Sequence, residues 1–526
     1  MHQAETLVFL VVLMTALVVI SRKLEIPYPV LLVLGGLVIS FIPGLPALRL
    51  QPDFVFYICL PLLIFPAALF TSWRDFRRNL RPILLLAIGL VLLTMAAVAI
   101  AAHLIVPGLP WAAAFALGAI VSPPDAIAAE AVMRRVSVPT RIESIVEGES
   151  LVNDATALVA LRFAVAAVAT GTFSPGYAAV QFIWTCLGGV AIGLGVGYIV
   201  RWAQKHLDDP PVQIAVSLLT PFLAYLGAER LHVSGVLATV TVGIFIGWHA
   251  PLILRARYRL QAQAFWEMVV FLINGLVFLT IGLQLPEILR QLTGESLSHL
   301  IGIGAAISAT VILVRIGWLL PAVWLRRFAF LRSHQGGAPP SWQELAVVAW
   351  SGMRGVISLA AAFALPFVLP NGSPFPGRGY ILYLTFCVIL ATLVLQGLTL
   401  PLLIRKLRIA DDGGNDEEER HARTEANRAA LELIERLASD CEVPRDVAKR
   451  LEAEYRERLA ELRQCASGPD ASGEIVTPHY RRLQYEALKV ERATIIRLRN
   501  EQVINDDALR RIQRDLDLAE ARLTGD

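Results

Sequence analysis

The sequence has few cysteines, dispersed histidines and little net charge, and each of these features argues against a class of protein. The five cysteines among 526 residues form no Cys-x-x-Cys pair, and their odd number argues against a complete disulfide framework. The nine histidines form no His-Glu-x-x-His motif, so we expect no transition-metal site and no cofactor. A net charge of +3 gives no support to a nucleic-acid partner.

Motifs of the common enzyme classes are also missing. No Gly-x-x-x-x-Gly-Lys-Ser/Thr loop is present, so ATP hydrolysis is not the driving force. No Gly-x-Ser-x-Gly nucleophile motif occurs, and the C-terminal part has no dinucleotide-binding Gly-x-Gly-x-x-Gly. An intramembrane enzyme would need a nucleophile with a base, or a metal cluster, and neither stands out. We therefore expect a protein that is not an enzyme.

Apolar residues dominate instead, at 56% of the chain, and charge is segregated along it. Residues 1–405 are mostly apolar runs with short charged loops, whereas residues 406–526 are dense in Arg, Glu and Asp. This pattern predicts an all-α polytopic membrane domain followed by a helical cytoplasmic tail. A membrane span needs about 20 apolar residues, and about thirteen runs qualify. They are residues 4–21, 28–43, 54–71, 82–105, 111–133, 142–170, 178–202, 211–229, 233–250, 262–284, 298–325, 341–368 and 379–404.

Basic loops predict the orientation of these spans. Clusters of Arg and Lys follow every odd-numbered span, beginning with Arg22-Lys23 and ending with Arg405-Lys406. The positive-inside rule then places the amino terminus outside and the tail in the cytoplasm. The first apolar segment lacks a basic n-region and a small-residue cleavage site, so we expect a retained first helix.

Two of the predicted spans contain helix-breaking residues. The fifth contains Ser122-Pro123-Pro124-Asp125, and the twelfth contains Ser351-Gly352-Met353-Arg354-Gly355. Consecutive prolines cannot continue a helix cleanly, and non-helical backbone at membrane depth is tolerated only where it lines a cavity or is buried in protein. Broken helices in corresponding positions of two triplets, spans four to six and eleven to thirteen, indicate inverted repeats around a transport site.

The sixth span carries four polar residues on one face of its helix. Glu149 and Asn153 are four residues apart, as are Ser150 and Asp154, so their side chains stack on neighbouring columns. Charge inside a bilayer is costly and is usually functional. Hard cations prefer such oxygen ligands. A carboxylate there can bind a cation or a proton, but hardly both, which predicts a cation/proton exchanger around Asp154.

Other charged residues extend this candidate site. Asp125 follows the double proline, where its carboxylate can meet the positive end of a half-helix while the backbone carbonyl of Pro124 faces a cation. Arg315 and Arg354 are buried arginines that need carboxylate partners, with Glu149 and Asp125 as candidates. We expect both arginines to be structural. Two further acidic residues, Glu130 and Glu267, are expected at solvated membrane ends.

At this point the sequence resembles a known family. Glu149-Ser150-Leu151-Val152-Asn153-Asp154-Ala155 is similar to the Asn-Asp signature of the monovalent cation/proton antiporters of the NhaP and NHE type, over about residues 1–405. Four further segments resemble the family pattern: Gly118 to Asp125, Arg354-Gly355 with Ser358-Leu359-Ala360, Ile26-Pro27-Tyr28-Pro29, and Val394 to Thr399. The tail, with Leu498-Arg499 and Asp515-Leu516-Asp517-Leu518, resembles the bacterial form.

The resemblance implies a homodimer in the bacterial inner membrane that exchanges Na+, and also Li+, for H+. A dimerisation domain would hold a mobile core that carries the ion by an elevator-like movement. Asp154 would be the shared carboxylate, assisted by Ser150, Asn153, Asp125 and the Pro124 carbonyl, the only metal being the transported Na+. Glu149 would pair with Arg354. Asparagine at position 153 would imply one cation exchanged for one proton.

One departure and two alternatives accompany this expectation. Many members of the family have Thr-Asp-Pro where this chain has Pro124-Asp125-Ala126, so the threonine hydroxyl is lost, although a backbone carbonyl can serve in its place. Oxygen ligands alone do not distinguish Na+ from K+, which keeps a potassium/proton antiporter open. From another class, a membrane sensor with a degenerate transport core is the remaining alternative.

Overall fold

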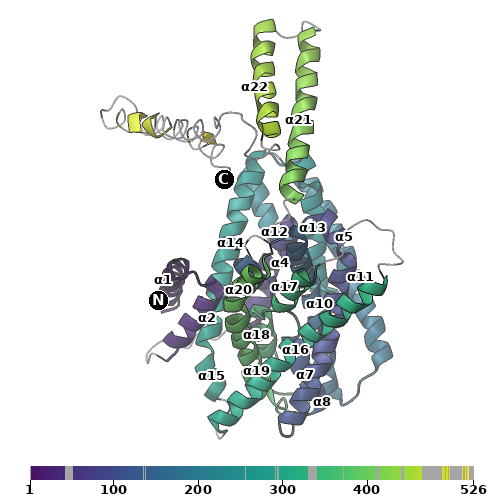
Figure 1. Cartoon of the computed structure of the whole chain (residues 1–526). Helices are drawn as coiled ribbons and strands as arrows, with labels where there is room; N and C mark the ends of the chain where they lie inside the picture. The colour runs from purple at the N-terminus through teal and green to yellow at the C-terminus, as the bar shows by residue number, and fades with distance from the viewer. Residues whose placement is uncertain are drawn as a thin grey trace. The chain divides into compact units, whose positions relative to one another are not determined.

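Helices make up almost all of the regular structure in the computed structural model of this chain (Figure 1). In the part that the structure describes, the only pairing of strand type is an isolated bridge between Val368 and Pro374. The described residues are 2–41, 51–133, 136, 138–254, 256–290, 292, 295–329, 341–370, 372–409, 414–439, 444–464 and isolated residues between 488 and 519. The chain divides into two compact units, residues 1–412 and residues 413–526.

The first unit contains the apolar helices. Its first half consists of α1 (His2–Lys23), α2 (Tyr28–Ile39), α3 (Pro52–Phe54), the π-helical η1 (Val55–Cys59), α4 (Leu60–Phe70), α5 (Trp73–Arg78), α6 (Leu80–Leu84), the π-helical η2 (Leu85–Leu90), α7 (Val91–Ile105), α8 (Trp111–Val121), α9 (Ala126–Met133) and α10 (Thr140–Thr170). Its second half consists of α11 (Pro175–Lys205), α12 (Pro210–Arg230), α13 (Gly235–Ile253), α14 (Ala256–Leu283), α15 (Leu285–Arg290), α16 (Leu297–Ala329), α17 (Trp342–Trp350), α18 (Val356–Phe363), α19 (Arg378–Ala391), the π-helical η3 (Thr392–Gln396) and α20 (Gly397–Leu407).

Helix is present at each of the thirteen apolar ranges found in the sequence. Among the described residues, nine helical segments are long and apolar enough to cross a membrane, and two shorter apolar helices fall at Tyr28–Ile39 and Gly235–Pro251. Helix is the expected solution because a bilayer offers no water to satisfy the backbone. The expectation of an all-helical protein is therefore confirmed. Some basic residues used to predict orientation, Arg134, Arg135, Arg255 and residues 330–332, lie outside the described residues.

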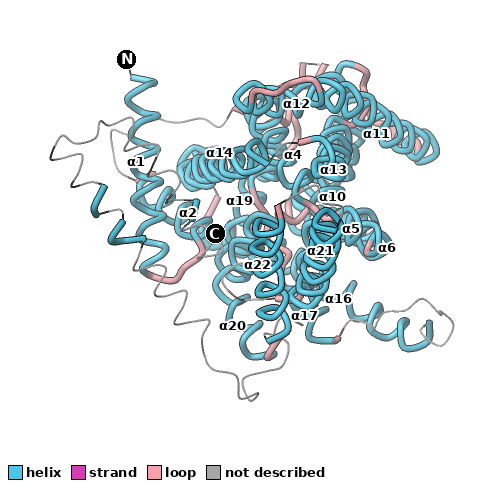
Figure 2. Tube along the Cα trace, turned by 90° about the horizontal axis from the view of Figure 1, so that it is seen from above, coloured by secondary structure: helices cyan, strands magenta, loops and turns pink. Residues whose placement is uncertain are grey.

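Glycines set the close packing of the first unit. A Cβ at Gly189 would meet the carbonyl oxygen of Ser234, and a Cβ at Gly193 would meet that of Ala238, so glycine lets α11 approach the backbone of α13. Between helices in lipid there is no hydrophobic driving force, and van der Waals packing through small residues stabilises the contact instead. Figure 2 shows the result from above: α1 and α2 lie on one side of α14, and α4, α11, α12 and α13 lie on the other.

Both helix breaks predicted from the sequence are present. The fifth predicted span is divided between α8, which ends at Val121, and α9, which begins at Ala126. The twelfth is divided between α17, which ends at Trp350, and α18, which begins at Val356. The unbroken helix α10 packs against α8, α9 and α17, so both breaks and the polar face of α10 come together inside the unit.

The second unit contains a helical hairpin. Its described helices, α21 (Gly414–Ser439) and α22 (Arg445–Gln464), pack against each other, and Arg456 on α22 forms an ion pair with Glu435 on α21 at 3.2 Å. The family-like positions at Leu498, Arg499, Asp515 and Asp517 lie outside the described residues. The assignment of residues 406–526 to a cytoplasmic tail stays a prediction.

Candidate functional site

The polar face of α10 lies in the interior of the first unit. Glu149, Asn153 and Asp154 are at most 4% exposed, and Ser150 is half-buried. A Cβ at Gly148 would meet the side chains of Ile83 and Phe76, so the helix surface that precedes these residues is pressed against its neighbours. Helix α10 is therefore a rigid support that places four polar side chains at fixed depth and spacing.

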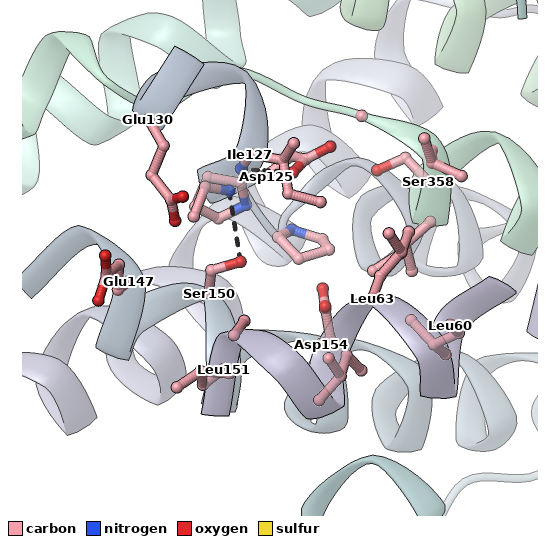
Figure 3. Close-up of a pocket in the computed structure, with 18 residues that line it drawn as sticks. Leu60, Leu63, Asp125, Ile127, Glu130, Glu147, Ser150, Leu151, Asp154 and Ser358 are labelled. Carbon is pink, nitrogen blue, oxygen red and sulfur yellow. Dashed lines mark hydrogen bonds between the residues drawn. The ribbon is translucent and has the colours of Figure 1, made fainter. Parts of the chain in front are cut away.

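A cavity of about 60 Å³ opens beside this face. In Figure 3 the carboxylate of Asp154 points into the space between α10 and the first break, and Ser150 and Asp125 border the same space. The volume holds a few water-sized occupants, which is enough for a small cation with part of its water shell. Within the described residues, the Asp154 side chain makes no hydrogen bond to protein, so its oxygens face the cavity.

Asp125 joins the two breaks. Its carboxylate Oδ1 accepts a hydrogen bond from the backbone N–H of Ile127 at 2.9 Å, and the backbone N–H of Val356 also hydrogen-bonds the carboxylate. The backbone N–H of Asp125 in turn donates to the carbonyl oxygen of Met353 at 2.7 Å. One carboxylate thus lies at the N-terminal, partially positive ends of both α9 and α18. The expectation that Asp125 meets the positive end of a half-helix is confirmed.

Ser150 and Asn153 fasten the first break to α10. The Ser150 Oγ accepts a hydrogen bond from the backbone N–H of Ala126 at 3.3 Å, and the Asn153 Nδ2 donates to the carbonyl oxygen of Pro124 at 3.1 Å. The Pro124 carbonyl can only accept, so the amide NH₂ must face it. The Asn153 Oδ1 is left buried, with no hydrogen-bond partner in the described part of the chain.

The oxygens of the site therefore differ in availability. The Asp154 carboxylate and the Asn153 Oδ1 have no protein donor, whereas the Pro124 carbonyl and the Ser150 hydroxyl each already accept one hydrogen bond. A carbonyl or hydroxyl oxygen retains a further lone pair, so both can still take part in a mixed oxygen shell. Such a shell suits a hard monovalent cation.

The buried arginines correct one sequence expectation. Glu149 does not pair with Arg354: its carboxylate accepts two hydrogen bonds from Arg315 on α16, at 2.6 and 2.8 Å, and both side chains are 1% exposed. Arg315 also donates to the Val348 carbonyl at 3.2 and 3.0 Å. This fork-to-fork geometry satisfies a buried pair of charges whose separation from water is otherwise costly.

Arg354 binds backbone carbonyls instead of a carboxylate. Its Nε donates to the carbonyl of Val121 at 3.0 Å, its Nη2 donates to that of Ser122 at 3.2 Å, and its Nη1 bonds the carbonyl of Gly352. Val121 is the last residue of α8 and Ser122 is its C-cap, where carbonyls have no helical partner and carry partial negative charge. The physical reason for the correction is this supply of orphaned carbonyls, which the break itself creates.

Two acidic residues that the sequence reasoning did not place in the site also line the cavity. Glu130 on α9, expected at a solvated membrane end, and Glu147 on α10 both border it and are half-buried (Figure 3). For Glu147 a signal was available, because it lies three residues before Ser150 and seven before Asp154, on the same helical face. Glu267, in contrast, is exposed as expected and accepts a hydrogen bond from Gln263.

The site does not resemble the His, Cys and carboxylate clusters that bind resident metal ions. Over the described ranges, no group of three or more His, Cys, Asp or Glu side chains is arranged to hold a metal ion. What the geometry offers is a single unpaired carboxylate, one amide oxygen and partly used backbone and hydroxyl oxygens. This arrangement can hold an exchangeable cation or a proton.

Comparison with known proteins adds independent findings. Residues 8–406 match the family described as sodium/hydrogen exchanger, transmembrane. An uncharacterised sodium/hydrogen exchanger of Mycobacterium tuberculosis is 35% identical over 98% of this chain and 96% of its own length. A sodium, potassium, lithium and rubidium/proton antiporter of Bacillus subtilis is 33% identical over 93% of this chain and 74% of its own.

The fold is also similar to a solved structure. The sodium/proton antiporter MjNhaP1 of Methanocaldococcus jannaschii superposes on 77% of this chain and 99% of its own with a TM-score of 0.58, at 20% identity. At that level of identity the likeness concerns the fold alone.

Proposed function

The chain belongs to the sodium/hydrogen exchanger family, and from that premise we propose that it exchanges Na+, and also Li+, for H+ with Asp154 as the shared binding group. Membership makes the chain a membrane transporter rather than an enzyme. The proposal concerns the substrate, the stoichiometry, the site residues and the movement that couples the two flows.

One observation carries the proposal: the Asp154 carboxylate is 4% exposed, faces a cavity and has no protein hydrogen-bond donor in the described part of the chain. A buried carboxylate must be neutralised, and here only a cation or a proton from the cavity can do so. The two occupants exclude each other, so binding of one releases the other. Competition at one group is the chemical basis of exchange.

Two other charges beside Asp154 already have protein partners. Glu149 is neutralised by Arg315, and Asp125 is held by the N-terminal ends of two helices. Neither needs to change its partner during transport. With one exchangeable carboxylate, one cation replaces one proton, and we propose an electroneutral 1:1 exchange, in line with the asparagine at position 153.

We extend the proposal to the assembly. Thirteen spans, an amino terminus outside, and a cytoplasmic tail after residue 405 agree with the basic loops. The two breaks, between α8 and α9 and between α17 and α18, contact each other and are consistent with inverted repeats. The core carrying α10 would move as an elevator within a homodimer in the bacterial inner membrane.

A potassium/proton antiporter is the second candidate, and a specific finding favours it. The relative from Bacillus subtilis is named for sodium, potassium, lithium and rubidium, so the family includes broad cation selectivity. The oxygen set around Asp154 contains no feature that rejects a larger monovalent ion. A sensor with a degenerate core is less consistent with the chain, because Asp154 and both breaks are intact.

The test measures proton movement in everted vesicles from antiporter-deficient cells, using dequenching of an acridine dye after addition of sodium, lithium or potassium salts. Wild type is compared with Asp154→Asn, and Glu267→Gln serves as a control that alters an exposed carboxylate of the same unit. Sodium- or lithium-dependent dequenching that is lost only in Asp154→Asn supports the proposal. Dequenching mainly by potassium supports the second candidate.

Two results would contradict the proposal. Exchange by Asp154→Asn at the wild-type rate would remove Asp154 from its role. Absence of any cation response in wild type between about pH 6 and pH 9, a range that brackets the titration of most perturbed carboxylates, would favour the sensor.

A further inference from the structure

A second, larger cavity of about 780 Å³ lies along the same helices as the Asp154 cavity. Along three continuous helical stretches the two cavities are lined by residues about one helical turn apart. These pairs are Asp154 and Leu158 on α10, Leu60 on α4 and Phe56 on η1, and Ser358 and Ala361 on α18. The second cavity therefore continues the direction of the first along α10.

Apolar side chains separate the two cavities. Leu60, Leu151 and Ala155 are buried in one hydrophobic cluster, against which Phe56 and Leu158 pack. A charged ion cannot cross such a layer without a movement of the helices, because burial of an unpaired charge is strongly unfavourable. An ion at Asp154 therefore reaches the second cavity only after these helices move.

An ion pair spans the second cavity. Arg162, about two helical turns beyond Asp154 on α10, donates from Nη2 to both carboxylate oxygens of Glu229 on α12, at 2.9 and 2.7 Å. Both side chains line the cavity. The two helices also meet through the hydrophobic cluster that holds Ala155 of α10 and Tyr225 of α12, and Arg162–Glu229 is the ion pair that joins them.

The exposure of this pair differs from that of the pair beside Asp154. The side chains of Arg162 and Glu229 are 51% and 21% exposed, whereas those of Arg315 and Glu149 are each 1% exposed. Breaking a buried pair strands two charges and is strongly unfavourable, but an exposed pair exchanges its partner for water at small cost. Arg315–Glu149 is therefore the pair that is costly to break, and Arg162–Glu229 is the pair that can open at small cost.

We propose that Arg162 and Glu229 form a latch that holds α10 against α12 in the conformation where Asp154 faces the smaller cavity, and that this latch opens in each transport cycle. The inference rests on the proposed function, since it requires Asp154 to change the side that it faces. In this proposal Arg162 and Glu229 position α10 and take no part in binding the transported ion. Opening the latch lets α10 move relative to α12, and closing it restores the observed state.

The latch predicts a coupled kinetic effect. In everted vesicles, Arg162→Gln and Glu229→Gln should each raise the apparent KM for Na+ by the same factor, about two- to fivefold, because losing an exposed ion pair depopulates the state that binds the cation. The double variant should match the single ones, and the reversal R162E/E229R should return the KM toward wild type. Arg428→Gln, which breaks an ion pair with Glu425 inside α21, is the matched control.

A second measurement separates a latch from a merely structural contact. Cysteines at positions 162 and 229 in a background without native cysteines would be joined by a short bis-methanethiosulfonate reagent. The cross-link should arrest exchange, and reduction should restore it. Full exchange in the cross-linked protein would overturn the latch. So would wild-type KM values in the two single variants, or a KM in R162E/E229R that is raised by the product of the two single factors. No exchange in wild type would overturn the proposed function itself.

Discussion

The guanidinium of Arg354 donates a hydrogen bond to the backbone carbonyl of Val121, at 3.0 Å, and thereby joins the second broken helix to the first. The two breaks satisfy each other's unpaired backbone groups. The first leaves carbonyls at the end of α8, which Arg354 binds, and the second leaves an N-terminal N–H group on α18, which Asp125 binds. Each interruption therefore supplies hydrogen-bond partners for the other, at a depth in the membrane where bulk water does not replace them.

Arg354→Ala should destabilise the protein and abolish exchange together. The change leaves the carbonyls of Val121 and Ser122 buried without a donor, at about 1–3 kcal/mol for each group. Thermal unfolding in detergent and exchange in vesicles measure the two effects. Arg290→Gln, on the exposed pair with Glu287, should alter neither. A stable, fully active Arg354→Ala would show that the breaks hold together without this residue.

Glu149→Ala should destabilise the protein more than Asp154→Asn does. Removal of Glu149 leaves the Arg315 side chain, which is 1% exposed, without its carboxylate partner. Deleting one partner of a buried ion pair lowers the free energy of unfolding by about 3–5 kcal/mol. Asp154 has no protein partner to strand, so Asp154→Asn should keep the wild-type free energy of unfolding while losing exchange. Denaturant unfolding of the two purified variants compares them. Equal stability would argue against a structural role for the Glu149–Arg315 pair.

The sequence predicts the helices and the breaks well because both are local properties. Apolar run length defines each span, and the Pro123-Pro124 pair interrupts the helix because it lies in the interior of an apolar run. The face of α10 with Ser150 and Asp154 is likewise predictable from helical spacing alone.

Partner choice among the buried charges is not local, and here the sequence is insufficient. Arg315 and Glu149 are 166 positions apart, and no spacing rule connects them. The family resemblance favours Arg354 as the partner, but the carbonyls that bind Arg354 lie beside it only when the two breaks come together in the fold. Glu130 lines the cavity because α9 packs beside α10, and the local sequence of α9 does not specify that packing.

The pH dependence of stability should include a contribution from Glu295, outside the apolar helices. The Tyr380 hydroxyl donates to Glu295 at 2.6 Å, and this bond, followed by one from His299, lowers the pKa of the Glu295 carboxyl. Because the pKa of Glu295 is lower in the folded than in the unfolded chain, its ionised carboxylate stabilises the fold at pH values above the unfolded pKa. This stabilisation is lost as the pH falls through the folded pKa. Tyr380→Phe should therefore reduce thermal stability at neutral pH but not in acid.

The control for this effect is Tyr177→Phe, which removes an exposed hydroxyl from another helix. Melting curves of wild type and both variants across the acid range give the comparison. A stability deficit of Tyr380→Phe that stays constant as pH falls would contradict an electrostatic origin and leave only lost packing.

Gly355→Ala should abolish exchange although it adds only a methyl group. A Cβ at position 355 would overlap the carboxylate of Asp125, so the second break would have to move away from the first. That movement would separate Asp125 from the N–H of Val356 and open the wall of the Asp154 cavity. Gly302→Ala on α16 is the matched control, because nothing lies within 4 Å of a Cβ there. Vesicle assays and thermal unfolding of both variants provide the measurement. Normal exchange by Gly355→Ala would mean that contact between the two breaks is not required for transport, since the added methyl cannot be accommodated while that contact is kept.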